Sequence, residues 1–261
     1  MTRTNASANP AAPNPSGQLD AWGWIDYSVP SPFSRWRWHI FVNRFLICLL
    51  AIVAPLGAQS EPYACPDTAV TVDAGSPEAD QEVCDLVARA STQLASCSLE
   101  ITRPLTITLA DSLSDDCYGQ FFCEDDLIKV LSPQALAAAV SDDSIYQALP
   151  DDTFFQGILV HELAHAATDD MPCPFESCLL GQEYISYAMM MQSFPDDQRT
   201  MLIEERFQRQ IYRDEVSLMI LAMAPEVFAQ KAWLHFSQRP DPCGFIGQIV
   251  DGTVLLDTEH F

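Results

Sequence analysis

Residues 161–165 read HELAH, an HExxH motif that contains two of the five histidines in the chain. Side chains four positions apart project from the same face of a helix, so the imidazoles of His161 and His165 can bind one Zn²⁺. Glu162 lies one position round the helix, where its carboxylate can face a water on the metal without displacing a ligand. The residues flanking the motif are uncharged, as expected for a buried helix that presents only its reactive face to a cleft.

A zinc site for hydrolysis needs three protein ligands and one open position. A third histidine often lies six positions after this motif, but the residue there is Met171. The remaining candidates are the carboxylates that follow the motif, namely Asp169, Asp170, Glu176 and Glu183. The first two lie too near the end of the metal-binding helix to fold back easily, which leaves Glu176 and Glu183 as the stronger candidates.

Glu183 lies inside a second predicted helix, and with it residues 154–192 resemble the active-site segment of the gluzincin group of zinc metallopeptidases. This group includes thermolysin-like and aminopeptidase-like enzymes. The resemblance implies a zincin-like fold, with His161, His165 and Glu183 as zinc ligands and Glu162 as general base and then general acid. The chain is also similar to an uncharacterised family of small secreted bacterial HExxH proteins with cysteine loops.

The sequence departs from the gluzincin pattern after the third ligand. Thermolysin-like enzymes carry an aspartate four residues beyond the ligand glutamate, where this chain has Tyr187. We expect the Tyr187 hydroxyl either to accept from an imidazole or to face the substrate oxyanion. His235 and Tyr212 are further candidates for the oxyanion, although a histidine near a helix end is more often a surface or capping residue. The aminopeptidase motifs are absent from the sequence, so it does not distinguish an endopeptidase from an exopeptidase.

The elements that must position these residues follow from apolar patterning, together with N-cap residues and prolines at their ends. We expect helices over 78–95, 134–140, 154–168, 179–193, 196–223 and 225–236, and strands over 101–110, 127–131 and 248–256. Asp151 and Asp152 are candidate N-caps for the motif helix. Pro104 favours an edge position for the first strand, and residues 59–77 read as an irregular segment tied down by Cys65. A small sheet region followed by helices indicates one α+β domain over 59–261.

The N-terminal part of the chain has the layout of an exported protein. Residues 1–34 are polar and rich in proline, and residues 35–58 combine arginines, a short apolar run and small residues, which indicates a signal peptide cleaved near Ala58. The alternatives are an uncleaved signal anchor, or a translation start further downstream, for instance at a codon for Val42. Cleavage near Ala58 predicts a secreted or periplasmic protein with no stable membrane association.

Cleavage would remove Cys48 and leave an even number of cysteines, which favours a framework of up to four disulfides. Two short loops look closable, Cys117 to Cys123 and Cys173 to Cys178. A metal-thiolate cluster is the alternative, but the chain has no CxxC pair.

The net charge of −23 excludes a nucleic-acid partner, because the chain has no basic footprint for phosphates. The combined expectation is an exported zinc-dependent hydrolase, specifically a metallopeptidase that acts on a peptide or protein substrate. The alternative is a secreted, disulfide-stapled binding protein whose zinc site is structural or catalytically silent. A third possibility is an interaction protein anchored at the membrane by its uncleaved N-terminal segment.

Overall fold

The computed structural model describes residues 62–114, 117–175 and 177–257. The polar leader at 1–34, the signal segment at 35–58 and the cleavage site near Ala58 lie outside these residues, and so does Glu176.

The described strands form one mixed five-stranded sheet in the order β1-β2-β3-β5-β4. Their bounds are β1 (Tyr63–Ala64), β2 (Val70–Asp73), β3 (Leu105–Ala110), β4 (Gly119–Phe122) and β5 (Leu127–Leu131). Strands β2, β3 and β5 are parallel, whereas β1 and β4 are antiparallel edge strands. The side chains of β3 alternate between the two faces of the sheet, as expected for a strand. Leu105 and Ile107 are buried, and Thr106 and Thr108 are half-buried.

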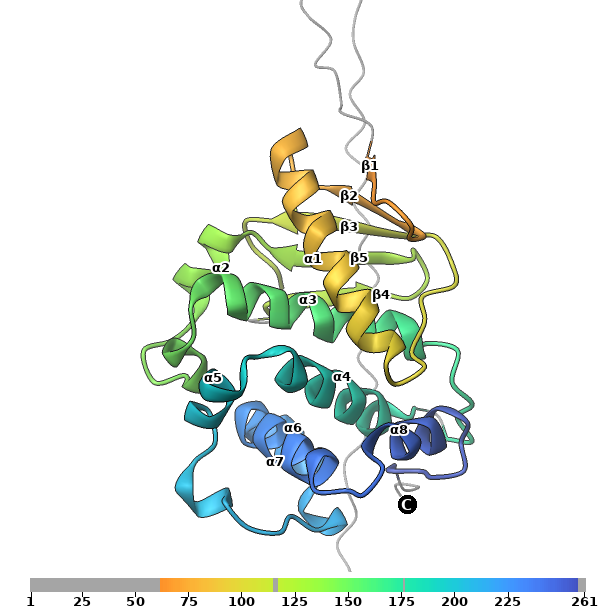
Figure 1. Ribbon diagram of the computed structural model, residues 1–261, viewed down its shortest axis with the longest axis vertical. Helices are drawn as coiled ribbons and strands as arrows, with labels where there is room; N and C mark the ends of the chain where they lie inside the picture. The colour runs from red at the N-terminus through yellow and green to blue at the C-terminus, as the bar shows by residue number, and fades with distance from the viewer. Residues whose placement is uncertain (1–61, 115–116, 176, 258–261) are drawn as a thin grey trace, which may run out of the picture. The chain divides into compact units, whose positions relative to one another are not determined.

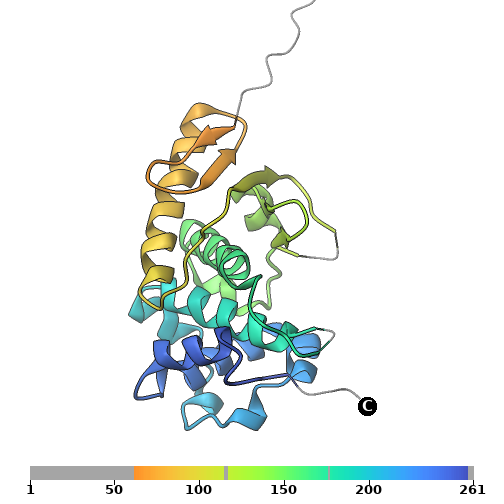
Figure 2. The same ribbon diagram turned by 90° about the vertical axis from the view of Figure 1, so that its right-hand side faces the viewer.

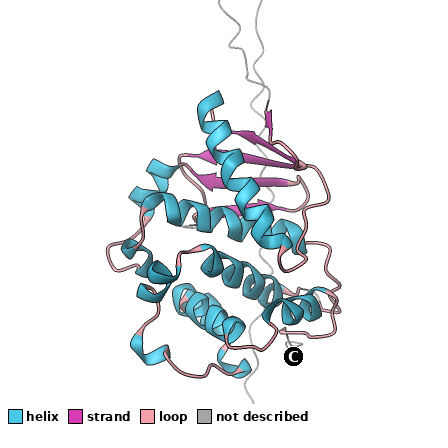
Figure 3. Cartoon of the chain, in the orientation of Figure 1, coloured by secondary structure: helices cyan, strands magenta, loops and turns pink. Residues whose placement is uncertain are grey.

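Helices make up most of the remaining described chain (Figure 3). The α-helices are α1 (Pro77–Ala95), α2 (Pro133–Ala139), α3 (Asp151–Thr168), α4 (Leu179–Ser193), α5 (Asp196–Met201), α6 (Leu218–Met223), α7 (Pro225–Ser237) and α8 (Pro242–Val250). Short 3₁₀ turns are η1 (Ile145–Ala148), η2 (Glu205–Phe207) and η3 (Arg213–Glu215). The predicted α+β class, with sheet first and helices after, is confirmed. None of the helices in the described part of the chain is both long and apolar enough to cross a membrane.

Helix α3 is the centre of this arrangement. Figures 1 and 2 show α1 and α3 on the same face of the sheet, with α4 on the side of α3 away from the strands and next to α7. Because α3 packs against both the sheet and α4, Leu159, Val160 and Leu163 have no exposed surface. Burying each such side chain contributes about 1.5–3 kcal/mol, so the motif helix is held firmly from two sides.

Three local predictions near the sheet were wrong. Pro104 precedes β3 rather than lying in it, so this strand keeps its backbone donors and occupies a central position. The segment predicted to be irregular contains β1 and β2, which pair as a hairpin. Asp151 and Asp152 are first-turn residues of α3, and Pro150 occupies the N-cap without a side-chain bond. The two carboxylates still lie near the positive end of the helix dipole.

Two predictions in the C-terminal part were also wrong. The predicted helix over 196–223 is broken between α5 and α6, where the buried side chains of Phe207, Ile211 and Val216 anchor an irregular segment. The strand predicted over 248–256 is instead the end of α8 and a turn. Gly252 has φ +76°, a conformation that glycine adopts without strain, and it reverses the chain there.

Three disulfides staple the described residues: Cys65–Cys84, Cys97–Cys243 and the predicted Cys173–Cys178. The predicted loop between Cys117 and Cys123 is not closed by a disulfide. These two cysteines flank β4, and an extended strand of that length holds their Cα atoms far beyond the limit of about 7 Å for a disulfide. The three disulfides suggest an oxidising environment.

Candidate metal centre

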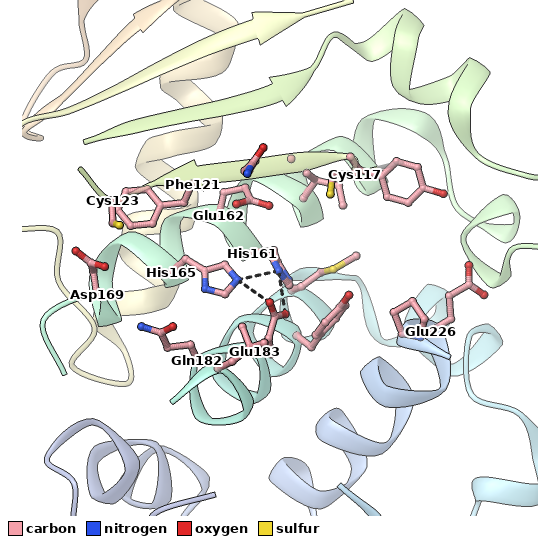
Figure 4. A pocket seen from close by; sticks show the side chains of 18 of the residues that line it. Cys117, Phe121, Cys123, His161, Glu162, His165, Asp169, Gln182, Glu183 and Glu226 are labelled. Atoms are coloured by element: carbon pink, nitrogen blue, oxygen red, sulfur yellow. Dashed lines mark hydrogen bonds and ion pairs between the residues drawn. The ribbon is translucent and has the colours of Figure 1, made fainter. Parts of the chain in front are cut away.

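Three predicted ligands converge on one point between α3 and α4 (Figure 4). The Nε2 atoms of His161 and His165 lie 3.1 Å apart. Each of them lies 3.6 Å from a carboxylate oxygen of Glu183. In the described part of the chain, these side chains are the one group of histidines, cysteines and carboxylates arranged to hold a metal ion.

The spacing of the two imidazoles and the carboxylate is close to that around a tetrahedral ion, with His161 nearest to one oxygen of Glu183 and His165 nearest to the other. Zinc bonds of about 2.0–2.2 Å to nitrogen and oxygen, with tetrahedral angles, place neighbouring ligand atoms about 3.3–3.5 Å apart. The observed separations of 3.1 and 3.6 Å bracket that range. The cluster can therefore hold a metal with three protein ligands and one open position.

The close packing of α3 against α4 fixes the ligands relative to one another. A Cβ atom at Gly157 would lie 2.4 Å from the ring of Phe194, so only glycine lets the end of α4 approach α3 this closely. Glu183 is four residues beyond the start of α4, whose N-cap Cys178 makes no side-chain capping bond. Asp257 supplies the cap instead, since it accepts from the backbone N–H groups of Leu180 and Gly181 at 2.9 and 3.0 Å.

Glu162 lies in the adjoining wall of the site, buried against β4. A Cβ atom at Gly119 would come within 2.7 Å of its carboxylate oxygen, so the backbone of β4 touches this side chain directly. Burial and the charge of Glu183 raise the pKa of Glu162 to about 8, although a hydrogen bond from the backbone N–H of Phe121 acts in the opposite direction. Such a carboxyl group is suited to accept and return a proton near neutral pH.

Burial also sets the charge state of the ligands. It lowers the pKa of His165 to about 4, and together with the nearby His165 it lowers the pKa of His161 well below the usual range. Burial raises the pKa of Glu183 to about 7. Both imidazoles are therefore neutral at physiological pH, which is the form that binds a metal. The Nδ1 atom of His161 is buried and has no hydrogen-bond partner in the described part of the chain.

The ligands and Glu162 line a cavity of about 710 Å³. Asp169 lies at one end, where Arg103 donates to its carboxylate at 2.8 Å. Asp170 is exposed and lies 3.5 Å from the same guanidinium group. Neither aspartate belongs to the ligand cluster, which agrees with the expectation that they cannot fold back. Glu176, the other alternative ligand, lies outside the described residues.

The predicted oxyanion candidates occupy different places. Tyr187 lines the cavity, and its ring packs edge-on against the ring of His161 with a centroid distance of 4.6 Å. Its hydroxyl does not accept from His161, whose free ring nitrogen has no partner among the described residues. His235 does not line the cavity and is buried on α7, bonded to Tyr184 and Arg239. Tyr212 is exposed at the start of η3 and does not line the cavity either.

Sequence reasoning missed several residues of the cavity wall. Gly119 and Phe121 were not considered because β4 has only four residues and was taken for a cysteine loop. Tyr146 and Glu226 reach the cavity from η1 and α7, and no motif links them to the HExxH segment. The helix that begins at Pro225 was predicted and η1 was not, and spacing in the sequence does not show that either element meets the motif helix.

Comparison with protein families gives one match. Residues 70–259 match a family described as "Family of unknown function (DUF6639)". The searches of curated proteins and of solved structures found no match.

Proposed function

The chain belongs to this family of unknown function, and from its site we propose that it is an exported zinc-dependent hydrolase, specifically a metallopeptidase. One observation carries the proposal: two imidazoles and one carboxylate converge within metal-binding distance and share a cavity with the buried carboxylate of Glu162, which lies on the same helix as the two histidines. Two imidazoles and one carboxylate are a donor set found in catalytic zinc sites with an open position. We assign the fold to the zincin-like class on the same basis.

Zinc at this site would polarise a substrate carbonyl and lower the pKa of a bound water toward about 7. His161, His165 and Glu183 would hold the ion from two helices that pack tightly against each other. Glu162 would take a proton from the attacking water and then deliver it to the leaving amine. The N–H of Phe121 fixes the orientation of the Glu162 carboxylate for both transfers.

The edge of the sheet supports a peptide substrate. Leu131 donates to the carbonyl of Tyr118, so the ladder between β4 and β5 uses alternate residues of β4. By that alternation, the backbone groups of Gly119 and Phe121 face away from β5 and toward the site. The Phe121 N–H is used by Glu162. An extended peptide would therefore pair with the remaining outward backbone groups of this edge, which would place its backbone along the cavity.

Tyr187 is our candidate for stabilising the oxyanion. Its ring lies against His161, and burial raises the pKa of its hydroxyl, with further contributions from Glu183 and Glu162. The hydroxyl is therefore protonated at neutral pH and can donate to a developing negative charge. His235 is no longer a candidate because it is bonded elsewhere in the core.

The proposal is tested with Glu162→Gln. Zinc stoichiometry should stay at one ion per chain, whereas kcat/KM on a pool of unstructured peptides should fall about 10²- to 10⁴-fold, the usual contribution of a general base. The matched control is Glu205→Gln, which makes the same change at an exposed position on η2 and should keep full activity. A fully active Glu162→Gln variant would remove this residue from the mechanism.

The rival function is a binding protein with a structural or silent zinc site. The observation that favours it is the unpartnered Nδ1 atom of His161, because metal-binding histidines normally donate their other ring N–H to an acceptor. In that case, chelation would lower the melting temperature while no peptide in the pool would be cleaved by the zinc-loaded protein.

A further inference from the structure

The cavity extends beyond the metal centre to a second acidic group. Figure 4 shows Glu226 and Asp169 on opposite sides of the three ligands. Asp169 is neutralised by Arg103 at 2.8 Å, but no arginine, lysine or histidine forms an ion pair with Glu226 in the described part of the chain. Apart from the two ligand histidines, no basic side chain lines the cavity among the described residues.

Glu226 is held in place by neutral donors. The Ser144 hydroxyl donates to one carboxylate oxygen at 2.6 Å, and the backbone N–H of Ile145 donates to the other at 3.1 Å. Each oxygen keeps a further lone pair for another donor. The carboxylate is therefore ordered and half-buried, and its charge is not compensated by a neighbouring cation.

Tyr146 provides a second polar group at the same end. Its side chain is 5% exposed, and its hydroxyl has no hydrogen-bond partner in the described residues. Tyr146 lines the same cavity as Tyr187 and Glu226. An unpaired buried hydroxyl is costly in a folded protein, and a ligand that donates to its oxygen would remove that cost.

No salt bridge in the described part of the chain includes Glu226, so its carboxylate leaves this end of the cavity with an unpaired negative charge. A substrate group that brings a positive charge and two or more N–H donors would satisfy both the carboxylate and the phenol oxygen.

We propose that Glu226 and Tyr146 form a subsite for a primary ammonium group of the peptide substrate. Such a group belongs either to a lysine side chain or to the free amino terminus of the peptide. This inference rests on the proposed peptidase function and adds the substrate class to it.

The experiment uses the full zinc-loaded protein and four sets of quenched fluorescent peptides of one scaffold. Acetylated peptides carry lysine, norleucine or acetyl-lysine at each position in turn, and the fourth set carries norleucine with a free amino terminus. We expect kcat/KM for the best lysine or free-terminus peptide to exceed that of its acetylated norleucine counterpart by about tenfold or more. Comparison of the lysine set with the free-terminus set shows whether the ammonium group comes from a side chain or from the amino terminus.

Variants test the assigned residues. Glu226→Gln should bring the ammonium-to-norleucine ratio close to one, while the matched control Glu205→Gln should keep the wild-type ratio. Tyr146→Phe should reduce the ratio without lowering the melting temperature, because the hydroxyl has no internal partner to lose. A clear loss of stability in Tyr146→Phe would show that the hydroxyl has a structural role and would remove it from the subsite.

Two outcomes separate the inference from the proposed function. Cleavage of all peptide sets with equal kcat/KM would overturn the subsite and leave the peptidase function standing. Absence of all cleavage would overturn the peptidase function. The subsite is then decided by fluorescence anisotropy, since the zinc-loaded Glu162→Gln variant must still bind the ammonium peptides more tightly than the norleucine ones.

Discussion

The Nε2 atoms of His161 and His165 lie 3.1 Å apart although burial keeps both rings neutral. Two nitrogen lone pairs at that distance repel each other unless a proton or a cation lies between them. Glu183 adds a carboxylate to the same point at 3.6 Å from each nitrogen. A divalent ion would replace the contact between the two nitrogens by three metal–ligand bonds, so metal binding should stabilise the folded chain.

Loss of one ligand should therefore be visible in metal affinity. Glu183→Ala should weaken zinc binding by about 100-fold or more, because even residues that only orient a ligand change affinity about 10- to 100-fold. The matched control is Gln182→Ala, the neighbouring cavity residue that is outside the ligand cluster, and its affinity should stay close to that of the wild type. Competition with a fluorescent chelator measures the zinc affinity of both variants. Equal affinities of the two variants would remove Glu183 from the ligand set.

Substitution of Gly119 should displace Glu162, the proposed general base, without changing its carboxyl group. A methyl group there would lie 2.7–3.0 Å from three atoms of the Glu162 side chain, so Gly119→Ala must push the carboxylate away. We expect kcat to fall by at least about tenfold while zinc stoichiometry is retained, since a small misplacement of a catalytic group can cost as much as 10²-fold. Gly247→Ala is the control, because no atom lies within 4 Å of its Cβ position. Gly247→Ala should leave the stability of the fold unchanged or raise it slightly, because alanine favours the helical conformation of α8.

At the scale of elements, the helix that carries Glu183 depends on a distant cap. Asp257 bonds to the first turn of α4 from the end of the described chain. Asp257→Ala should lower the free energy of unfolding by about 1–2 kcal/mol and also weaken zinc binding. Asp251→Ala, which removes only a local turn bond to Thr253, should have little effect on zinc. Urea denaturation and zinc titration of both variants test this, and unchanged zinc affinity in Asp257→Ala would show that the cap does not position the ligand.

His235 connects α4 to α7 in a way that depends on pH. Arg239 donates to its Nε2 atom at 2.9 Å, so the neutral ring carries its proton on Nδ1 and donates to the Tyr184 oxygen. Burial, followed by the charges of Arg239 and Arg213, lowers the pKa of His235 to about 4. Because the unfolded chain has a pKa near 6.5, the unfolded state takes up the proton first as the pH falls.

This linkage predicts a loss of stability of about 3 kcal/mol from His235 between about pH 7 and pH 4. His235→Gln keeps one acceptor and one donor but does not titrate, so it should show a shallower decline over that range. Melting curves of both proteins from pH 4 to pH 8 measure the difference. Parallel pH profiles would contradict the assignment of this titration to His235.

The sequence predicted those elements whose signals are local. The HExxH helix and α4 were found because each is a long apolar-rich run, the first preceded by Asp151 and Asp152 and the second followed by Pro195. Strand β4 was missed because its four residues do not alternate and two cysteines suggested a loop. His235 was placed near the oxyanion, but its direction on α7 depends on how that helix packs against Tyr184. A contact of this kind between two helices cannot be predicted from the pattern of apolar residues in a single sequence.

At the scale of the whole molecule, disulfides of very different span hold the chain together. Cys97–Cys243 has a sequence separation of 146, whereas Cys173–Cys178 has a separation of 5. The entropy of closing a loop grows with its length, which gives about 5 kcal/mol for the long loop and about 2 kcal/mol for the short one. The long disulfide should therefore contribute more to the stability of the whole fold than the short one.

Replacing Cys97 and Cys243 by serine should lower the free energy of unfolding by about 3–5 kcal/mol. Replacing Cys173 and Cys178 should cost less stability but weaken zinc binding more, because their loop lies between the two helices that carry the ligands. Urea denaturation and zinc titration of the two double variants give the comparison. The reverse ranking in stability would show that strain or residual structure outweighs loop entropy.

The long disulfide also changes what a single backbone cut can do. His161, His165 and Glu183 all lie between positions 97 and 243, inside a covalent ring closed by Cys97–Cys243. A protease that cuts once in this ring, for instance in the irregular segment after α5, opens the ring but leaves one continuous molecule. The three candidate ligands stay on one fragment, and the other fragment remains tethered to it through Cys97–Cys243 until the disulfide is reduced. A nicked chain should therefore migrate as intact protein on a non-reducing gel.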